Sequence, residues 1–274
     1  MDCVKVFNQS IGASIVDWFP ALADLPRWLQ PWRAHWERLD RWNYNVYRSW
    51  WVPAREKVMN GTAPPSFVRD TLLHSDTRFT GDDDDAMYVA MQLIEAGSGT
   101  TTESLNIMVM AALERPEAFV RARQEVDRVC GAGSEARLPV LGDMESLGYI
   151  CAMAKELLRW RPIFAVFPDH VSLKDIEFEG YRFPAGTSFV INQTVVGDEC
   201  EDPERFMPER WLGDGREADI THGMWQFGGG RRVCVGYRLA QRSLFINIAR
   251  LVQCFDFEAV SCFFLFIEVL LKTR

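Results

Sequence analysis

The residues with the clearest chemical potential lie between Phe227 and Gly236, where the chain reads FGGGRRVCVG. Three successive glycines allow a tight turn and a close approach of the backbone to another body. Cys234 comes just before a predicted helix, where free N–H groups and the helix dipole favour a thiolate. Taken alone, Cys234 could be a nucleophile, a soft metal ligand or a small buried apolar residue.

Three further groups of residues could support such a site. Glu156 and Arg159 are spaced i, i+3 on a predicted helix and therefore face each other. Arg205 lies in a Pro-rich charged loop, within Pro203-Glu-Arg-Phe206. A long predicted helix contains Ala96-Gly-Ser-Gly-Thr-Thr101, and glycine inside a helix costs about 1 kcal/mol relative to alanine. The two glycines therefore indicate that another group approaches the helix closely at this point, or that the helix is kinked.

The elements that must position these residues are mostly helical. Helices are predicted from about 81 to 113, from 117 to 129, from 145 to 160 and from 236 to 254. Between the last two, residues 170–194 alternate short β-type runs with turns at Gly180 and Gly186. The fold class is thus mainly α with a small β-sheet (α+β).

The first 80 residues are predicted to be helical and are rich in tryptophan and arginine. Trp28, Trp32 and Trp36 are spaced i, i+4, i+8, which predicts one aromatic helix face. This face could pack on the protein body or lie on a membrane surface. The net charge of −8 argues against a nucleic-acid partner. Seven cysteines without a CxxC pair indicate a reducing compartment.

The spacing of Phe227, Gly230, Arg232, Cys234 and Gly236 matches FxxGxRxCxG, and the chain thereby resembles the cytochrome P450 family, of a fungal type. The resemblance implies haem b, with Cys234 as iron ligand, Phe227 shielding the sulfur and Arg232 pairing with a propionate. Glu156, Arg159 and Arg205 resemble the family's structural triad. Gly97 and Thr100 match its central-helix motif, in which the threonine helps deliver protons during oxygen activation. His170 resembles a propionate partner, but a purely structural histidine is an equal alternative.

The chain departs from the family pattern at Gly99, where an acid is usual. The resemblance implies a partial fold, from the F–G helical region to the L helix. It divides the chain into a Trp-rich F–G-like region (1–80), a haem-binding core (81–254) and an atypical tail (255–274), whose sequence does not match the family's β-hairpin. We expect a protein truncated at its N-terminus, with no signal peptide or membrane anchor in this sequence.

By resemblance, the function is that of a monooxygenase that inserts one atom of O₂ into a lipophilic small molecule in fungal secondary metabolism. NADPH would supply electrons through NADPH–cytochrome P450 reductase, at the cytosolic face of the endoplasmic reticulum. Peripheral membrane contact would involve the Trp-rich region. Two alternatives remain open: a non-catalytic remnant that cannot enclose haem, and a haem enzyme that catalyses rearrangement or dehydration.

Overall fold

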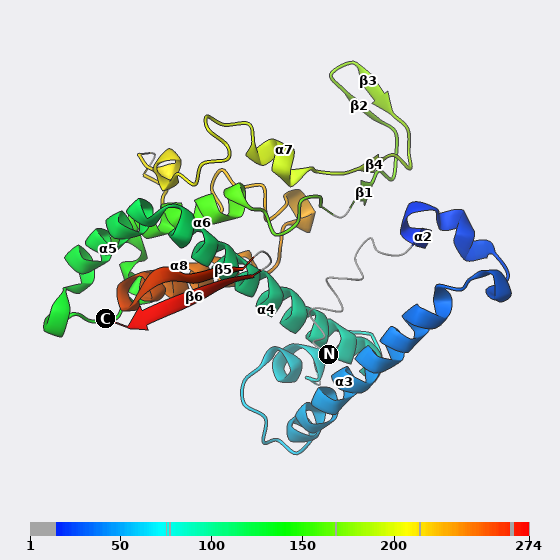
Figure 1. The fold of residues 1–274 in the computed structure, drawn as a ribbon. Helices are drawn as coiled ribbons and strands as arrows, with labels where there is room; N and C mark the ends of the chain where they lie inside the picture. Colours follow the sequence, from blue (N-terminus) through cyan, green and yellow to red (C-terminus); the bar gives the residue numbers. More distant parts are fainter. Residues whose placement is uncertain are drawn as a thin grey trace. The chain divides into compact units, whose positions relative to one another are not determined.

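The computed structural model describes residues 15–74, 76, 78–167, 169–213, 215–263 and 266–273 (Figure 1). Helices dominate, and the described strands form three two-stranded antiparallel sheets. The chain divides into two compact units, Met1–Gly99 and Thr100–Arg274, so that the division falls within the long helix α4 (Asp83–Glu114).

The first unit is built on α3 (Arg33–Met59) and the first half of α4. It also contains α2 (Ile15–Trp18), two 3-10 turns (Pro20–Asp24 and Arg27–Leu29) and a π-helical turn (Val68–Leu72). Its core consists of the buried side chains of Tyr47, Trp51, Leu72, Ala86, Met87, Ala90 and Met91.

The prediction that Trp28, Trp32 and Trp36 form one face of a single helix was wrong. Helix α3 begins only at Arg33, and Trp28 lies in the preceding 3-10 turn, where it is 80% exposed. Pro31 separates the two elements, and the residue before a proline is disfavoured in a helix. The buried aromatic residues of α3 are Tyr47 and Trp51.

Helix α4 agrees closely with the predicted helix over 81–113. Its start is fixed by two reciprocal hydrogen bonds: the Asp85 N–H donates to Asp82 Oδ1 at 2.8 Å, and the Asp82 N–H donates to Asp85 Oδ2 at 3.1 Å. These bonds occupy N–H groups that a helix start otherwise leaves without a partner, and the acidic side chains suit the positive end of the dipole.

The second unit packs α5 (Pro116–Cys130), α6 (Gly148–Trp160) and α8 (Tyr237–Cys254) around one apolar core. Every residue of α6 from Tyr149 to Trp160 is buried, which makes it the central element of this unit. The unit also contains α7 (Gln193–Gly197) and short 3-10 turns at Gly133–Glu135, Leu141–Ser146, Pro208–Trp211 and Gly230–Arg232.

The predicted β region forms two small sheets. Strand β1 (His170–Val171) pairs with β4 (Ser188–Phe189), and β2 (Ile176–Phe178) pairs with β3 (Tyr181–Phe183). The β2–β3 hairpin turns through Glu179 and Gly180, both of which have positive φ. Figure 1 shows this hairpin projecting beyond α7.

The expectation that the tail departs from a β-hairpin was wrong. Strand β5 (Phe255–Phe263) pairs antiparallel with β6 (Phe266–Thr273), with a register shift between Ala259 and Ser261. The tail is rich in Phe and also contains Val and Ile, all of which favour strands, and this propensity outweighs the unusual sequence.

Among the described residues, no helix combines the length and the hydropathy that a bilayer span requires.

Candidate functional site

Cys234 lies at the end of a closed backbone loop, three residues before the start of α8. The Cys234 N–H donates to the Phe227 carbonyl at 2.8 Å, so the loop returns to its starting point. The Phe227 side chain packs against the core of the second unit, which anchors this end of the loop. The Cys234 side chain is exposed. The arrangement therefore presents one thiol from a loop fixed at its base.

The glycines of this loop have distinct roles. Gly228 and Gly230 have φ values of +71° and +59°, a left-handed conformation that other residues rarely adopt. Gly236 precedes the first residue of α8, and a Cβ added there would meet Cys234 Sγ at 3.8 Å. Gly236 therefore keeps the space beside the sulfur open, while the other two glycines allow the turn.

Helix α8 begins three residues after Cys234. The Tyr237 N–H donates to the Cys234 carbonyl at 3.3 Å, and the Ala240 N–H donates to the Gly236 carbonyl at 2.9 Å. The thiol is thus placed near the positive end of an 18-residue helix. Arg231 and Arg232, which are both exposed, add positive charge to the same loop.

Glu156 and Arg159 form a buried ion pair on α6. Arg159 Nη2 donates to Glu156 Oε1 at 2.8 Å, and Arg159 Nε donates to Glu156 Oε2 at 2.9 Å. Their side chains are 0% and 2% exposed, respectively. A buried ion pair requires such a two-point contact, because no water is there to compensate the two charges.

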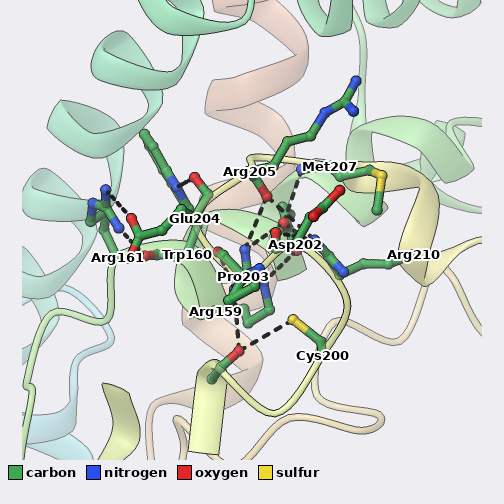
Figure 2. Close-up of polar contacts among 12 residues, drawn as sticks. Arg159, Trp160, Arg161, Cys200, Asp202, Pro203, Glu204, Arg205, Met207 and Arg210 are labelled. Carbon is green, nitrogen blue, oxygen red and sulfur yellow. Dashed lines mark hydrogen bonds and ion pairs between the residues drawn. The ribbon is translucent and has the colours of Figure 1, made fainter. Parts of the chain in front are cut away.

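The guanidinium of Arg159 also binds the loop that follows α7. It donates to the carbonyls of Gly197, Pro203 and Arg205, at 3.2, 2.9 and 3.3 Å (Figure 2). Burial acts to lower the pKa of Arg159, but the hydrogen bond and charge of Glu156 keep it above its ordinary value. Arg159 therefore stays charged and ties α6 to this loop.

The third member of the cluster is Arg210, which corrects the assignment of Arg205. Arg210 Nε donates to Glu156 Oε1 at 3.0 Å, and its side chain is only 12% exposed. Arg205 contributes its main-chain carbonyl instead, and Figure 2 shows its exposed guanidinium pointing away from Arg159. Two further groups donate hydrogen bonds to the Glu156 carboxylate: the Met207 N–H at 2.9 Å and Trp211 Nε1 at 2.8 Å.

The sequence contains a signal for Arg210. Pro-Glu-Arg occurs twice, at Pro203–Arg205 and at Pro208–Arg210. Only the second copy forms a 3-10 turn (Pro208–Trp211), which directs Arg210 and Trp211 toward Glu156. An aromatic residue follows each copy, so that this feature could not distinguish them.

The predicted residues of the central helix lie on α4, on either side of the division between the two units. Gly97 is exposed, and a Cβ added there would meet nothing within 4 Å. Thr100 is half-buried, and its carbonyl accepts a hydrogen bond from Ser104 Oγ at 3.0 Å. The helix runs from Asp83 to Glu114 through both glycines without a break.

His170 is exposed on β1, opposite Phe189 of β4. Within the described part of the second unit, no hydrogen bond joins His170 or the side chain of Arg232 to the cysteine loop or to the Glu156 cluster. Their predicted roles toward a cofactor therefore remain predictions.

Comparison with known proteins relates this site to one family. The family profile described as Cytochrome P450 matches residues 8–262. The chain is 36% identical over 258 residues to cytochrome P450 monooxygenase verL of Clonostachys rogersoniana, covering 89% of this chain and 47% of the relative. It is 34% identical over 272 residues to cytochrome P450 monooxygenase virE of Hypocrea virens, covering 94% of this chain and 48% of that protein.

Solved structures agree with this relationship. A zebrafish cytochrome P450 with progesterone superposes with a TM-score of 0.68 at 25% identity, covering 86% of this chain and 58% of that chain. A second zebrafish structure, with abiraterone, gives a TM-score of 0.65 at 27% identity, covering 81% of this chain and 57% of that one. The chain spans about half the length of the curated relatives it matches. Over that span, it belongs to the cytochrome P450 family.

Proposed function

We propose that this chain is the haem-thiolate part of a monooxygenase, which inserts one atom of O₂ into a lipophilic small molecule in fungal secondary metabolism. Membership in the family implies a haem cofactor, whose thiolate-bound iron supplies the chemistry of oxygen activation. The observation that carries the proposal is the exposed thiol of Cys234, a residue whose backbone N–H donates to the Phe227 carbonyl three residues before α8 begins. The curated relatives named above are monooxygenases from fungi, which supports the same reaction class.

The residues of the cysteine loop fit a haem. In the described part of the chain, no group of three or more His, Cys, Asp and Glu residues could hold a metal. The loop offers one thiolate, Cys234, which would suit an iron whose other ligands a porphyrin supplies. Trp225 Nε1 and the side-chain amide of Gln226 are buried without a hydrogen-bond partner, directly before Phe227. Polar atoms of this kind can form hydrogen bonds with a polar group of a bound cofactor or with water.

Under this proposal each residue has a separate task. Cys234 would bind the iron, Arg232 and His170 would neutralise propionates, and Gly97 would allow a close approach to α4. Thr100 supplies a hydroxyl for proton transfer near the substrate. NADPH provides two electrons through NADPH–cytochrome P450 reductase. One oxygen atom enters the substrate, while the other leaves as water with two protons.

The Trp-rich region supports contact with a membrane surface. Phe19, Trp28 and Trp50 are 62%, 80% and 52% exposed, and Arg27 lies beside Trp28 with its side chain 73% exposed. Aromatic and cationic side chains favour the interface of an anionic bilayer. Sedimentation with anionic vesicles tests this contact, and binding that persists after Trp28→Ala and Trp50→Ala would contradict it.

Reconstitution with haem tests the proposed function directly. The full chain is expressed, loaded with haem, reduced and exposed to CO. We expect the Soret band characteristic of thiolate ligation, and its loss in Cys234→Ser. Cys254→Ser, which changes a partly buried thiol at the far end of α8, is the matched control and should keep the band. A wild-type chain that binds no haem would instead favour the non-catalytic remnant.

One observation favours a second candidate, a rearrangement or dehydration. Gly99 replaces the acid usual in the central-helix motif, so the proton relay lacks one member. Consumption of O₂ and NADPH with substrate separates the two reactions, because a rearrangement requires neither. Gly99→Asp should increase coupled NADPH consumption if the monooxygenase reaction is correct.

A further inference from the structure

Lys155 is a buried cation next to Glu156 on α6. It is 1% exposed, a degree of burial that lysine almost never shows without compensation. Successive helical residues point about 100° apart, so Lys155 leaves α6 in a different direction from Glu156. Its Nζ donates to the Arg216 carbonyl at 3.1 Å. Lys155 therefore reaches the segment at Arg216, whereas the hydrogen bonds of Glu156 and Arg159 to the loop end on residues 197–211.

Two further groups stabilise the ammonium. Lys155 Nζ lies over the Trp211 ring, 5.8 Å from its centroid, within the range of a cation–π contact. Asp219 is the second group. Partial burial acts to raise the pKa of Asp219, but hydrogen bonds from Thr221 and the attraction of Lys155 hold it below its ordinary value. The buried positive charge of Lys155 is thus compensated by Trp211 and Asp219, which flank the Arg216 carbonyl that it binds.

Trp211 connects Lys155 with the Glu156 cluster. Its indole Nε1 donates to Glu156 Oε2 at 2.8 Å, while its ring lies beneath Lys155 Nζ. Two consecutive residues of α6 consequently hold two consecutive stretches of the loop. Glu156 binds the stretch Met207–Trp211, and Lys155 binds Arg216.

The segment 216–218 is also tied to α8. Gln241 Nε2 donates to the Ala218 carbonyl at 2.6 Å, two residues beyond the carbonyl that Lys155 binds. Gln241 lies in the second turn of α8, the helix that begins three residues after Cys234. The backbone of 216–218 is therefore a bridge between α6 and the cysteine-bearing end of α8.

We propose that Lys155 is a positioning residue for Cys234: it fixes segment 216–218 on α6, and this segment sets the first two turns of α8 through Gln241. The role toward a bound iron rests on the proposed function. The mechanical coupling does not, because it concerns contacts within the chain. Loss of the ammonium should loosen segment 216–218 and the start of α8, while α5 keeps its packing against the core.

Amide hydrogen exchange of the full chain without haem tests the coupling. In Lys155→Met, which keeps the length and removes the charge, exchange in 216–218 and 234–241 should accelerate about fivefold, as expected for one net hydrogen bond. Lys155→Arg should restore most of the protection. Lys174→Met, on an exposed residue, is the matched control and should change neither segment.

A second variant keeps the test decisive if Lys155→Met fails to fold. Gln241→Ala leaves Lys155 intact and removes the bond to the Ala218 carbonyl together with the longer contact to Met144 Sδ, so it should loosen the same two segments. Unchanged exchange in Gln241→Ala, or equal acceleration throughout α5, α6 and α8 in Lys155→Met, would overturn the proposal.

Haem loading then separates the two proposals. A wild-type chain without the thiolate Soret band refutes the function but leaves the exchange result standing. If the wild type shows the band, Lys155→Met should convert a measurable fraction to a band without thiolate ligation, and Lys155→Arg should reverse this. An unaltered spectrum in Lys155→Met would contradict the positioning role.

Discussion

Arg210 Nε donates to Glu156 Oε1 at 3.0 Å, whereas Arg205 reaches the same cluster only through its carbonyl oxygen. The two arginines end two copies of Pro-Glu-Arg that lie five residues apart, yet they make different kinds of contact. A side chain can be removed by mutation and a carbonyl cannot. The pair therefore provides a matched comparison.

Arg210→Ala should destabilise the chain by about 2 kcal/mol, because it removes a charge-assisted hydrogen bond from a fully buried carboxylate. Arg205→Ala should change the unfolding free energy by less than about 0.5 kcal/mol, since its side chain is exposed and its carbonyl remains. Urea unfolding followed by tryptophan fluorescence measures both values. Equal destabilisation by the two substitutions would contradict the assignment of Arg210.

Gly230→Ala tests the geometry of the cysteine loop. Gly230 has φ +59°, where a Cβ costs roughly 1–2 kcal/mol, and no neighbour lies within 4 Å of the added atom. The expected loss of stability therefore comes from the backbone alone.

Gly229→Ala is the control, because Gly229 has an extended backbone at φ −155° and equally open surroundings. Thermal unfolding of both variants should show a loss only for Gly230→Ala. If Gly229→Ala were as destabilising, the strain would not lie in the left-handed turn.

Fold and motif were largely predictable from the sequence because they depend on local patterns. The start of α4 follows from Asp82 and Asp85, and the spacing around Cys234 identified the family. Arg210 could not be separated from Arg205, since both copies of the motif satisfy the same local rule. Lys155 gave no signal at all, because its burial depends on Arg216 and Trp211, more than fifty residues away.

Asp143 should make stability depend on pH in acid. Two hydrogen bonds from Arg137, both 2.7 Å long, and one from the Val140 N–H lower the pKa of Asp143 to about 2. A carboxyl whose pKa falls on folding stabilises the native state above its unfolded value of 3.8, and this contribution is lost as the pH falls toward 2. The melting temperature should accordingly decline in that window.

Asp143→Asn should lower the melting temperature at neutral pH and flatten its decline between about pH 4 and pH 2. Calorimetry at several pH values compares the variant with the wild type. Parallel curves for the two proteins in that window would show that Asp143 does not carry the proton uptake.

Cysteine alkylation at pH 8 should separate Cys234 from Cys151. Cys151 is 0% exposed, and burial, followed by the charge of Glu125, raises the pKa of its thiol to about 12. Only the thiolate is nucleophilic, so Cys151 should remain unmodified in the folded chain. Cys234, which is exposed, should react within minutes of adding iodoacetamide. Peptide mapping by mass spectrometry measures both, with urea-unfolded protein as the control in which both react. Comparable labelling of Cys151 under native conditions would mean that α6 opens readily, which would contradict its place at the centre of the core.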